Sequence, residues 1–394
     1  MTPVSPLRNE LVARARMVGA GLKARAAEGD GLRRLPDANV ADLRAAGFFD
    51  LMKPARWGGL EVDPGTFYEV QATLAESCAS SAWVLGVVGI HPWQLALFPD
   101  EAQEEVWGVD RSVLIASSYM PVGRVTTVDG GFRLTGRWAF SSGIDHCRWV
   151  LLGAMVPPGP GEKFPEMRTF LVPQADYRVV DTWNVSGLRA TGSNDVVVDD
   201  VFIPLHRTHR LLDGYTGQNP GNAGNPAPLY RLPFGQIFVR AISTTALGIA
   251  QGALDAYRDG VKGAFGRLDG AKLAEETSPR ELAATATVTL RELRRGLHAH
   301  CDWMMGLATA GQSIPVEERL TWRLESALAA RRAAEVVEAL FHATAARGIA
   351  VDSPMQRAFQ DAQAARAHYA NNPEKPARNL GGVLLGLRNG DYFV

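Results

Sequence analysis

The segment RWAFSSGIDHCRWV, residues 137–150, combines side chains that a simple turn does not require. Two tryptophans and a phenylalanine surround two serines, a glycine and an Asp–His pair. The flanking sequences FRLTG and VLLGAM are rich in strand-forming residues, so they predict a β-strand before and after the turn. Flat rings, small hydroxyls and open backbone at one turn are suited to holding a planar ligand.

Two further segments carry the same kinds of side chain. Ser117-Ser118-Tyr119 places hydroxyls at the end of an apolar strand, and residues 183–195 read WNVSGLRATGSND. A planar, polar cofactor would explain all three segments, because hydroxyls and amides bind its heteroatoms while tryptophan packs its apolar edge. Each segment alone is also consistent with an ordinary turn between strands. Together they favour a cofactor site.

Other chemistries find little support in the sequence. Residues 19–24, GAGLKA, match a loose dinucleotide-binding pattern, but they lie in a helical pattern with no strand before them. His298, Cys301 and Asp302 share one helix face, yet no second cluster would complete a metal site. Cys301 also lies on an apolar stripe, which favours a buried structural cysteine. The sequence therefore predicts neither a nicotinamide site of the usual kind nor a metal site.

Composition limits the possible partners. The chain of 394 residues has 41 basic and 42 acidic side chains, so it offers no charge imbalance for nucleic acid or an anionic membrane. It has no run of 18 apolar residues, and its first residues lack the apolar core of a signal peptide. The three cysteines are widely spaced, which argues against a disulfide framework. These features predict a cytoplasmic protein without a membrane segment.

The order of predicted elements is that of an α+β protein with three parts. Residues 1–111 have helical periodicity, residues 112–212 form short β-branched runs separated by turns, and residues 213–394 are helical again. The last part opens with a Gly/Asn/Pro-rich stretch at 213–228, expected to be a loop over a functional cleft or a mobile linker. Long amphipathic helices follow it and predict a bundle.

Several motifs resemble one family. WAFSSG (138–143), GLRATGSNDVVVDDVFIP (187–204) and AHYANNP (367–373) occur in the order seen in the acyl-CoA dehydrogenase fold. They are most similar to its oxygenase branch, the two-component flavin-dependent monooxygenases that include hydroxylases of steroid phenol rings and of para-hydroxyphenylacetate. The resemblance implies an N-terminal helical domain, a middle β-barrel or sandwich and a C-terminal four-helix bundle.

The resemblance also implies an activity. A separate NAD(P)H:flavin reductase would deliver reduced FAD or FMN by diffusion, and O2 would add to the flavin as a C4a-hydroperoxide. Its terminal oxygen would then attack a small aromatic substrate of phenolic, polycyclic or indole type. Members of the family form homotetramers, and this chain is expected to do the same.

The resemblance assigns roles to matching positions. His368 corresponds to the catalytic base and hydroperoxide partner, and its near-neutral pKa would suit that work. Ser142 corresponds to the serine that bonds the flavin near N5. Lys262 and Phe265 replace an R-x-x-F motif that reaches the flavin phosphate of a neighbouring subunit. The cofactor-binding residues implied are Ser117, Tyr119, Trp138, Phe140, Ser141, Ser142, Gly143, Lys262, Phe265, Thr344 and Ala345. The substrate-binding residues implied are Trp83, Val84, His91, Asp145 and Asn194.

The chain departs from the family at three positions. Gln360, Gln363 and Asn372 stand where relatives carry ionisable side chains. Uncharged amides suggest a substrate that needs less help in losing a proton, such as an electron-rich indole or a polyphenol. Two alternatives stay open: a flavoprotein that oxidises a thioester, which would need a carboxylate base where this chain offers His368, and a non-catalytic flavin- or ligand-binding relative.

Overall fold

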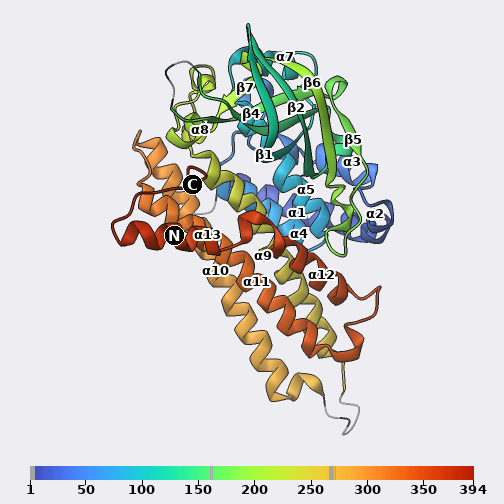
Figure 1. The fold of residues 1–394 in the computed structure, drawn as a ribbon. Coiled ribbons are helices and arrows are strands. Elements are labelled where there is room, and N and C mark those ends of the chain that lie inside the picture. Colours follow the sequence, from blue (N-terminus) through green and yellow to red (C-terminus); the bar gives the residue numbers. More distant parts are fainter. Residues whose placement is uncertain (1–4, 160, 162, 266–269, 271) are drawn as a thin grey trace.

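A computed structural model describes residues 5–159, 161, 163–265, 270 and 272–394. Figure 1 shows a β region at one end, a long helical bundle at the other, and the N-terminal helices packed between and beside them. Within these described residues, seven strands lie between Ile115 and Arg210, and helices precede and follow them. The turn after residue 141 packs against the N-terminal helices, through contacts of Ser142 with Trp83 and of Gly143 with Val84.

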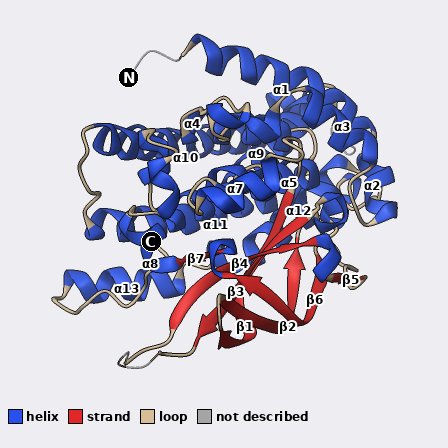
Figure 2. Ribbon diagram, turned by 90° about the horizontal axis from the view of Figure 1, so that it is seen from above, coloured by secondary structure: helices blue, strands red, loops and turns tan. Residues whose placement is uncertain are grey.

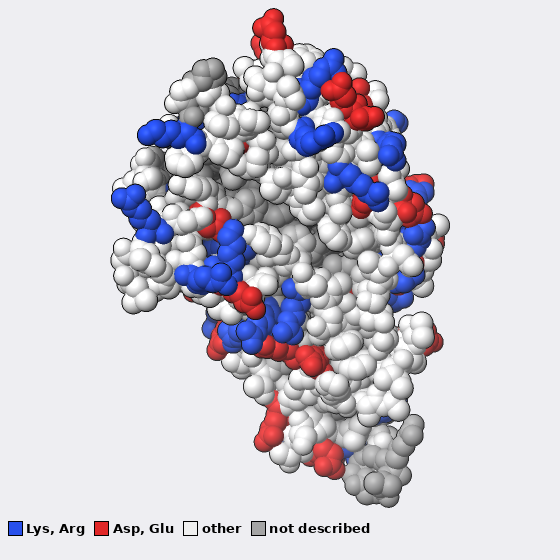
Figure 3. Space-filling model, in the orientation of Figure 1, with Lys and Arg blue, Asp and Glu red and all other residues white. Residues whose placement is uncertain are grey.

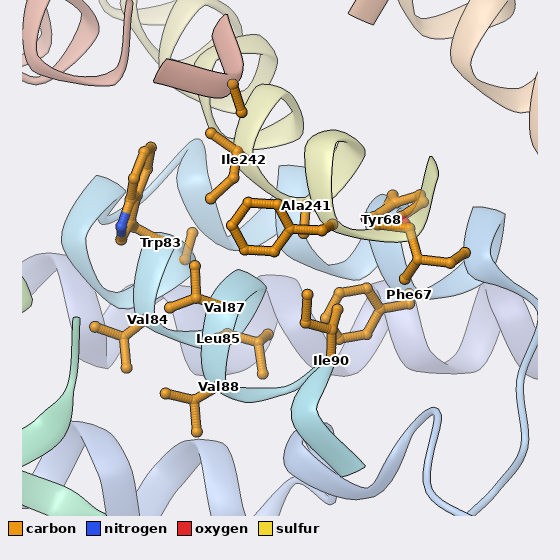
Figure 4. Close-up of a cluster of buried hydrophobic side chains, with 14 of the residues drawn as sticks. Phe67, Tyr68, Trp83, Val84, Leu85, Val87, Val88, Ile90, Ala241 and Ile242 are labelled. Atoms are coloured by element: carbon orange, nitrogen blue, oxygen red, sulfur yellow. Dashed lines mark hydrogen bonds between the residues drawn. The ribbon is translucent and has the colours of Figure 1, made fainter. Parts of the chain in front are cut away.

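The N-terminal part consists of short helices around a buried core. They are α1 (Pro6–Ala24), α2 (Ala26–Leu32), α3 (Asp37–Ala45), α4 (Pro64–Ala75), α5 (Ala79–Val88), α6 (His91–Leu95) and α7 (Asp100–Trp107). Every residue of α5 is buried, which explains why its sequence ASSAWVLGVV has no polar face. Figure 4 shows α5 side chains such as Leu85 and Val87 in one apolar cluster with Ala241 and Ile242.

The β region is one bent, mixed sheet. Its strands are β1 (Ile115–Val128), β2 (Gly131–Ser141), β3 (Trp149–Val156), β4 (Glu166–Pro173), β5 (Arg178–Val180), β6 (Asn194–Pro204) and β7 (Thr208–Arg210), in the order β5-β6-β2-β1-β3-β4-β7. The first half of β1 pairs in parallel with β3 and its second half pairs antiparallel with β2, with a register shift between Ser118 and Gly123. The two halves of the sheet face each other, since the rings of Phe132 and Phe170 lie 5.6 Å apart. The predicted sandwich-like β domain is therefore confirmed.

The C-terminal part is a helical bundle built around one central helix. Its helices are α8 (Leu211–Thr216), α9 (Phe234–Lys262), α10 (Thr277–Thr309), α11 (Val316–Ala343), α12 (Pro354–Ala367) and α13 (Glu374–Leu384). Helix α9 packs against α10, α11 and α12, and also against α4 and α5. It is long and apolar enough to cross a membrane, but 89% of its most apolar window is buried, which identifies a core helix. Figure 2 shows the helices gathered on one side of the strands.

The Gly/Asn/Pro-rich segment 213–228 is packed, which contradicts a mobile linker, while the loop over a functional cleft stays a prediction. It holds the end of α8 and two short 3₁₀ helices. Asn225 donates to the carbonyl of Ala96 (2.8 Å) and to Gln103 Oε1 (3.0 Å), and both bonds are buried. A side chain at Gly221 would overlap the Ala96 carbonyl. Asparagine side chains thus satisfy the backbone groups that a helix would have paired, and glycine permits the close approach.

Candidate active site

The candidate site lies where α5, the turn after β2 and the end of α12 meet. The indole Nε1 of Trp83 donates to Ser142 Oγ at 3.1 Å. The ring of Trp83 also lies edge-on to that of His368, with 5.5 Å between the centroids. Three residues from distant parts of the sequence, each expected at the site, are thus brought together.

The turn after β2 owes its shape to Gly143. This residue has φ +72°, and its N–H donates to the carbonyl of Thr191 at 2.8 Å. A Cβ at this position would lie 2.9 Å from the Cγ1 atom of Val84, closer than side-chain atoms pack. Glycine is therefore required both by the backbone conformation and by the contact with α5.

Phe140, just before the turn, is held in an unusual conformation. It has φ +64°, although it is not glycine, and its side chain is 62% exposed. Its ring stands at 88° to the ring of Trp183, with 6.2 Å between the centroids. Left-handed backbone at a bulky residue is costly, and it is common at ligand sites. An aromatic pair near Ser142, with Phe140 exposed and Trp183 half-buried, suits the edge of a planar ligand.

A chain of buried hydroxyls runs inward from Ser142. Its Oγ lies 2.8 Å from Ser193 Oγ, which lies 2.7 Å from Thr191 Oγ1. Thr191 Oγ1 donates to the carbonyl of Leu188 at 2.9 Å. Sequence analysis marked the segment TGS as small and polar but did not assign these two hydroxyls to the site. Neither residue lies in a strand, so the sequence held no spacing signal for them.

His368 ends α12 instead of lying within it, because the helix stops at Ala367. Its Nδ1 accepts the backbone N–H of Ala370 at 3.0 Å, so the hydrogen of the neutral ring is on Nε2. Burial and the neighbouring Arg323 lower the pKa of His368 to about 4. This corrects the expectation of a near-neutral base: the imidazole is neutral over the physiological range and presents a donor.

His91 and Tyr119 form a second aromatic group, from α6 and β1. His91 is fully buried, and its Nδ1 bonds to the carbonyl of Ile115. Its Nε2 has no hydrogen-bond partner within the described part of the chain. Burial lowers the pKa of His91 to about 4, so the ring is neutral and Nε2 keeps a free lone pair. The hydroxyl of Tyr119 bonds Gln94.

Two residues expected at the ligand have structural contacts instead. Trp138 is fully buried between the halves of the sheet, and its indole donates to the Gly153 carbonyl at 2.8 Å. Asn194 accepts the backbone N–H groups of Thr182 and Trp183, both at 3.1 Å. Trp138 therefore supports the β domain, and Asn194 holds a loop. Both patterns look polar and aromatic in sequence, but the hydrogen-bond partners are visible only in the fold.

The remaining predicted residues divide between the site and the far end of the bundle. Val84 lies beneath the turn, and Ser117 lies on β1. The hydroxyl of Ser141 is buried and has no partner among the described atoms. Asp145 is exposed and accepts a hydrogen bond from Asn194. Lys262, Phe265, Thr344 and Ala345 lie at the ends of α9 and α11. Figure 1 places those helix ends away from the β region, so one chain does not bring them to Ser142.

The departures from the family have visible contacts. Asn372 Oδ1 accepts the N–H of Glu374, the first residue of α13, at 2.9 Å. Gln360 and its largely buried neighbour Asp361 line a pocket of about 860 Å³ beside α12. Asp361 Oδ1 accepts the N–H of Leu188 at 2.6 Å and thereby ties α12 to the loop that carries the hydroxyl chain.

The surface and the wall of the site fit the expected cofactor class. Figure 3 shows basic and acidic side chains intermingled on one face, which is hollowed near its middle where few charges lie. Around Ser142, the buried hydroxyl of Ser141, which has no partner among the described atoms, and the exposed ring of Phe140 form a cradle for a polar, planar group. These residues therefore fit a flavin ring.

Comparison with known proteins identifies the family. A model described as "Acyl-CoA dehydrogenase, C-terminal domain" matches residues 240–373. The flavin-dependent monooxygenase oxygenase subunit HsaA of Rhodococcus jostii (strain RHA1) is 40% identical over 380 residues, covering 95% of this chain and 97% of that protein. The chain belongs to the oxygenase components of flavin-dependent monooxygenases.

Two further comparisons agree with this assignment. The oxygenase resembles the crystal structure of 3-HSA hydroxylase from Rhodococcus sp. RHA1 with a TM-score of 0.92 and 39% identity, covering 98% of this chain and 99% of that one. The FADH(2)-dependent resorcinol hydroxylase, oxygenase component, of Rhizobium sp. (strain MTP-10005) is 33% identical, covering 97% of this chain and 96% of that protein. The predicted family and its acyl-CoA dehydrogenase-like fold are confirmed, and the oxygenase uses reduced flavin and O2.

Asp361 leads to a prediction about stability. Burial, with Asp30 of α2 nearby, raises the pKa of Asp361 to about 7, although the Leu188 N–H and Arg357 oppose the shift. A raised carboxyl pKa means that the folded state favours the protonated form, so stability falls as pH rises from about 4 through 7. Asp361→Asn, which stays neutral, should be more stable than wild type by about 1–3 kcal/mol at pH 8 and nearly equal at pH 4.

Chemical denaturation at a series of pH values would measure this difference. Asp352→Asn is a matched control, since Asp352 is an exposed carboxyl of the loop before the same helix. The control should follow the wild-type pH dependence. A constant offset between Asp361→Asn and wild type across the series would show that the buried carboxyl is not the titrating group.

Proposed function

We propose that this oxygenase hydroxylates a small aromatic substrate of phenolic, polycyclic or indole type, using reduced FAD or FMN from a separate NAD(P)H:flavin reductase. The observation that carries the proposal is the meeting of Ser142, Trp83 and His368 at one cradle, in a chain of this family. The names of the relatives, which include a resorcinol hydroxylase, support an aromatic substrate.

Bound reduced flavin, with O2, supplies the electrons and the oxygen atom for the reaction. Ser142 would accept the N–H at flavin N5 and keep that proton in place. His368 would donate a hydrogen bond from its Nε2–H to the oxygen atom that is transferred, since its Nδ1 already accepts the N–H of Ala370. Trp83 and Phe238, whose rings flank His368, would exclude water from the reacting oxygen.

The substrate would lie between Trp83 and His91. A tryptophan ring packs well against an aromatic ring, and the free Nε2 lone pair of His91 can accept a phenol O–H or an indole N–H. Both histidines are neutral, so nothing in this group strongly removes a proton from the substrate. That property suits an electron-rich ring that reacts without full ionisation, and Val84 and Asp145 would line the same side.

The assembly is proposed to be a homotetramer in the cytoplasm. Several large apolar side chains of the C-terminal helices are exposed in the single chain, including Trp303, Leu385 and Leu387. Lys262, Phe265, Thr344 and Ala345 lie at the far end of the bundle, which supports a role toward the flavin of a neighbouring subunit. The free, buried cysteines are consistent with a reducing compartment.

The proposed function predicts which form of flavin binds. The purified protein should be nearly colourless and should bind reduced flavin more tightly than oxidised flavin, because flavin enters and leaves as a substrate. Anaerobic titration with reduced FAD and FMN, compared with titration by the oxidised forms, measures this. Stoichiometric oxidised flavin retained after gel filtration would instead favour the thioester-oxidising alternative. Failure to consume any aromatic substrate with excess reduced flavin and O2 would favour a non-catalytic relative.

Substitution of Ser142 should separate flavin protection from hydroxylation. Ser142→Ala removes the acceptor for the N5 proton, whose loss accompanies release of hydrogen peroxide. The variant should still hydroxylate, but it should waste more reduced flavin as hydrogen peroxide. Product and peroxide formed per flavin oxidised would be measured together. If Ser142→Ala forms as much product per flavin oxidised as the wild type, Ser142 does not protect the N5 proton.

Substitution of His368 should affect hydroxylation itself. His368→Ala should lower the hydroxylation rate by about 10²–10⁴-fold, the range for groups that hold or transfer a proton. Because the pKa of His368 is about 4, the hydroxylation rate of the wild type should not change in slope near pH 6.5, and neither should that of the variant. Melting temperature serves as the control for a purely structural role. A variant of lower stability with wild-type product yield would contradict the assignment.

A further inference from the structure

The hydroxyl chain behind Ser142 has a direction. The carbonyl of Leu188 can only accept, so Thr191 Oγ1, 2.9 Å away, uses its single hydrogen there. Ser193 Oγ must then donate to Thr191 across 2.7 Å, and Ser142 Oγ must donate to Ser193 across 2.8 Å. The indole of Trp83, which is only a donor, supplies a hydrogen to Ser142 at 3.1 Å.

Ser142 therefore has no hydrogen left for a ligand. Its oxygen donates to Ser193, accepts from Trp83 and keeps one lone pair. Reduced flavin carries a hydrogen on N5, whereas oxidised flavin carries a lone pair there. We propose that Thr191 and Ser193 are positioning residues that fix the Ser142 hydroxyl as an acceptor, and that they thereby make the site selective for reduced over oxidised flavin. This inference rests on the proposed flavin site.

The end of the chain is held by the fold. Leu188 has φ +52°, and its N–H is bound by the carboxyl of Asp361 at 2.6 Å. Its carbonyl also receives the indole N–H of Trp183 at 3.3 Å. Thr191 and Ser193 are 1% and 3% exposed, so water does not compete for their hydrogens. A rigid acceptor at one end and buried intermediates keep the hydrogens pointing away from the ligand.

The cost of the wrong flavin form follows from this direction. The lone pair of Ser142 Oγ and the lone pair on N5 of oxidised flavin would repel each other. Leaving these two acceptors without a donor costs about as much free energy as one hydrogen bond. A network that served only to stabilise the loop would not distinguish the two redox states of the ligand. The ratio of the dissociation constants for oxidised and reduced flavin therefore reports on the direction of the hydroxyl chain.

Thr191→Val tests the inference, since it removes the hydroxyl and keeps a similar volume. Ser193 then loses its acceptor and can donate to Ser142, which in turn can donate to N5 of oxidised flavin. The ratio of the oxidised to the reduced dissociation constant should fall about tenfold, with tighter binding of oxidised flavin. Thr191→Ser, which retains the hydroxyl, should restore the wild-type ratio. Anaerobic titration of each purified variant with both forms of FAD and FMN gives these values.

The matched control is a second buried serine pair. Ser243 and Ser326 lie 2.8 Å apart between α9 and α11, and Ser326→Ala removes a hydrogen bond of the same kind. This control should lose stability and keep the wild-type ratio. Ser193→Ala is a second test variant, in which Ser142 loses its acceptor and the ratio should fall in the same direction.

Several outcomes would overturn the inference. They are an equal affinity of the wild type for both flavin forms, an unchanged ratio in Thr191→Val or Ser193→Ala, and a changed ratio in Ser326→Ala. The titrations contain no aromatic substrate, so they are separate from the test of hydroxylation. If the wild-type enzyme hydroxylates an aromatic substrate but Thr191→Val leaves the ratio of oxidised to reduced dissociation constants unchanged, only this inference is wrong. If Thr191→Val shifts this ratio but the wild-type enzyme hydroxylates no aromatic substrate, the proposed function is wrong instead.

Discussion

The burial of α9 between the N-terminal helices and the bundle is the constraint on which the site depends. Two buried side chains of α4 fix its position: Tyr68 donates to the Ile237 carbonyl at 2.8 Å, and Gln71 donates to the Ala241 carbonyl at 2.6 Å. Both bonds would leave costly unpaired groups if the helices slid along each other. Because α5 and α12 also pack on α9, Trp83 and His368 are placed against each other from opposite ends of the chain.

The β domain joins the same arrangement through close backbone contacts. Gly143 brings the turn after β2 against Val84 of α5, and Gly187 brings the hydroxyl-bearing loop against the backbone of Gln360 in α12. Side chains at either glycine would push these surfaces apart. The cradle is therefore built by three parts of the chain that would each be ordinary alone, and small residues set how close those parts come.

Local patterns in the sequence predicted much of this fold because they depend on neighbouring residues. Turn residues between short β-branched runs indicated the strands, and helical periodicity indicated the helices before and after them. Resemblance supplied Ser142, Trp83 and His368, which the structure brings together. Patterns could not show which polar groups were already satisfied. Trp138 and Asn194 looked available for a ligand, yet their hydrogen bonds go to the backbone of other segments.

In segment 213–228 the sequence pattern was misleading in the opposite way, because it did not show how firmly the segment is bonded to the rest of the fold. Its composition is typical of a loop, but Asn225 and Asn219 bond to partners more than ten residues away and make it part of the core. The pKa of His368 was likewise beyond reach of the sequence. It depends on burial by Trp83 and Phe238 and on the position of Arg323, all set by tertiary packing.

Hydrogen placement, more than charge, characterises this site. His368 and His91 are both neutral, each with one nitrogen committed to the backbone, so one presents a donor and the other a lone pair. In our proposal Ser142 adds an acceptor, with its hydrogen directed toward the buried Ser193. A reactive oxygen on the cofactor is lost when a proton moves at the wrong moment. In the proposed mechanism, fixed neutral donors and acceptors would control that proton without introducing a charged group that would draw water into the site.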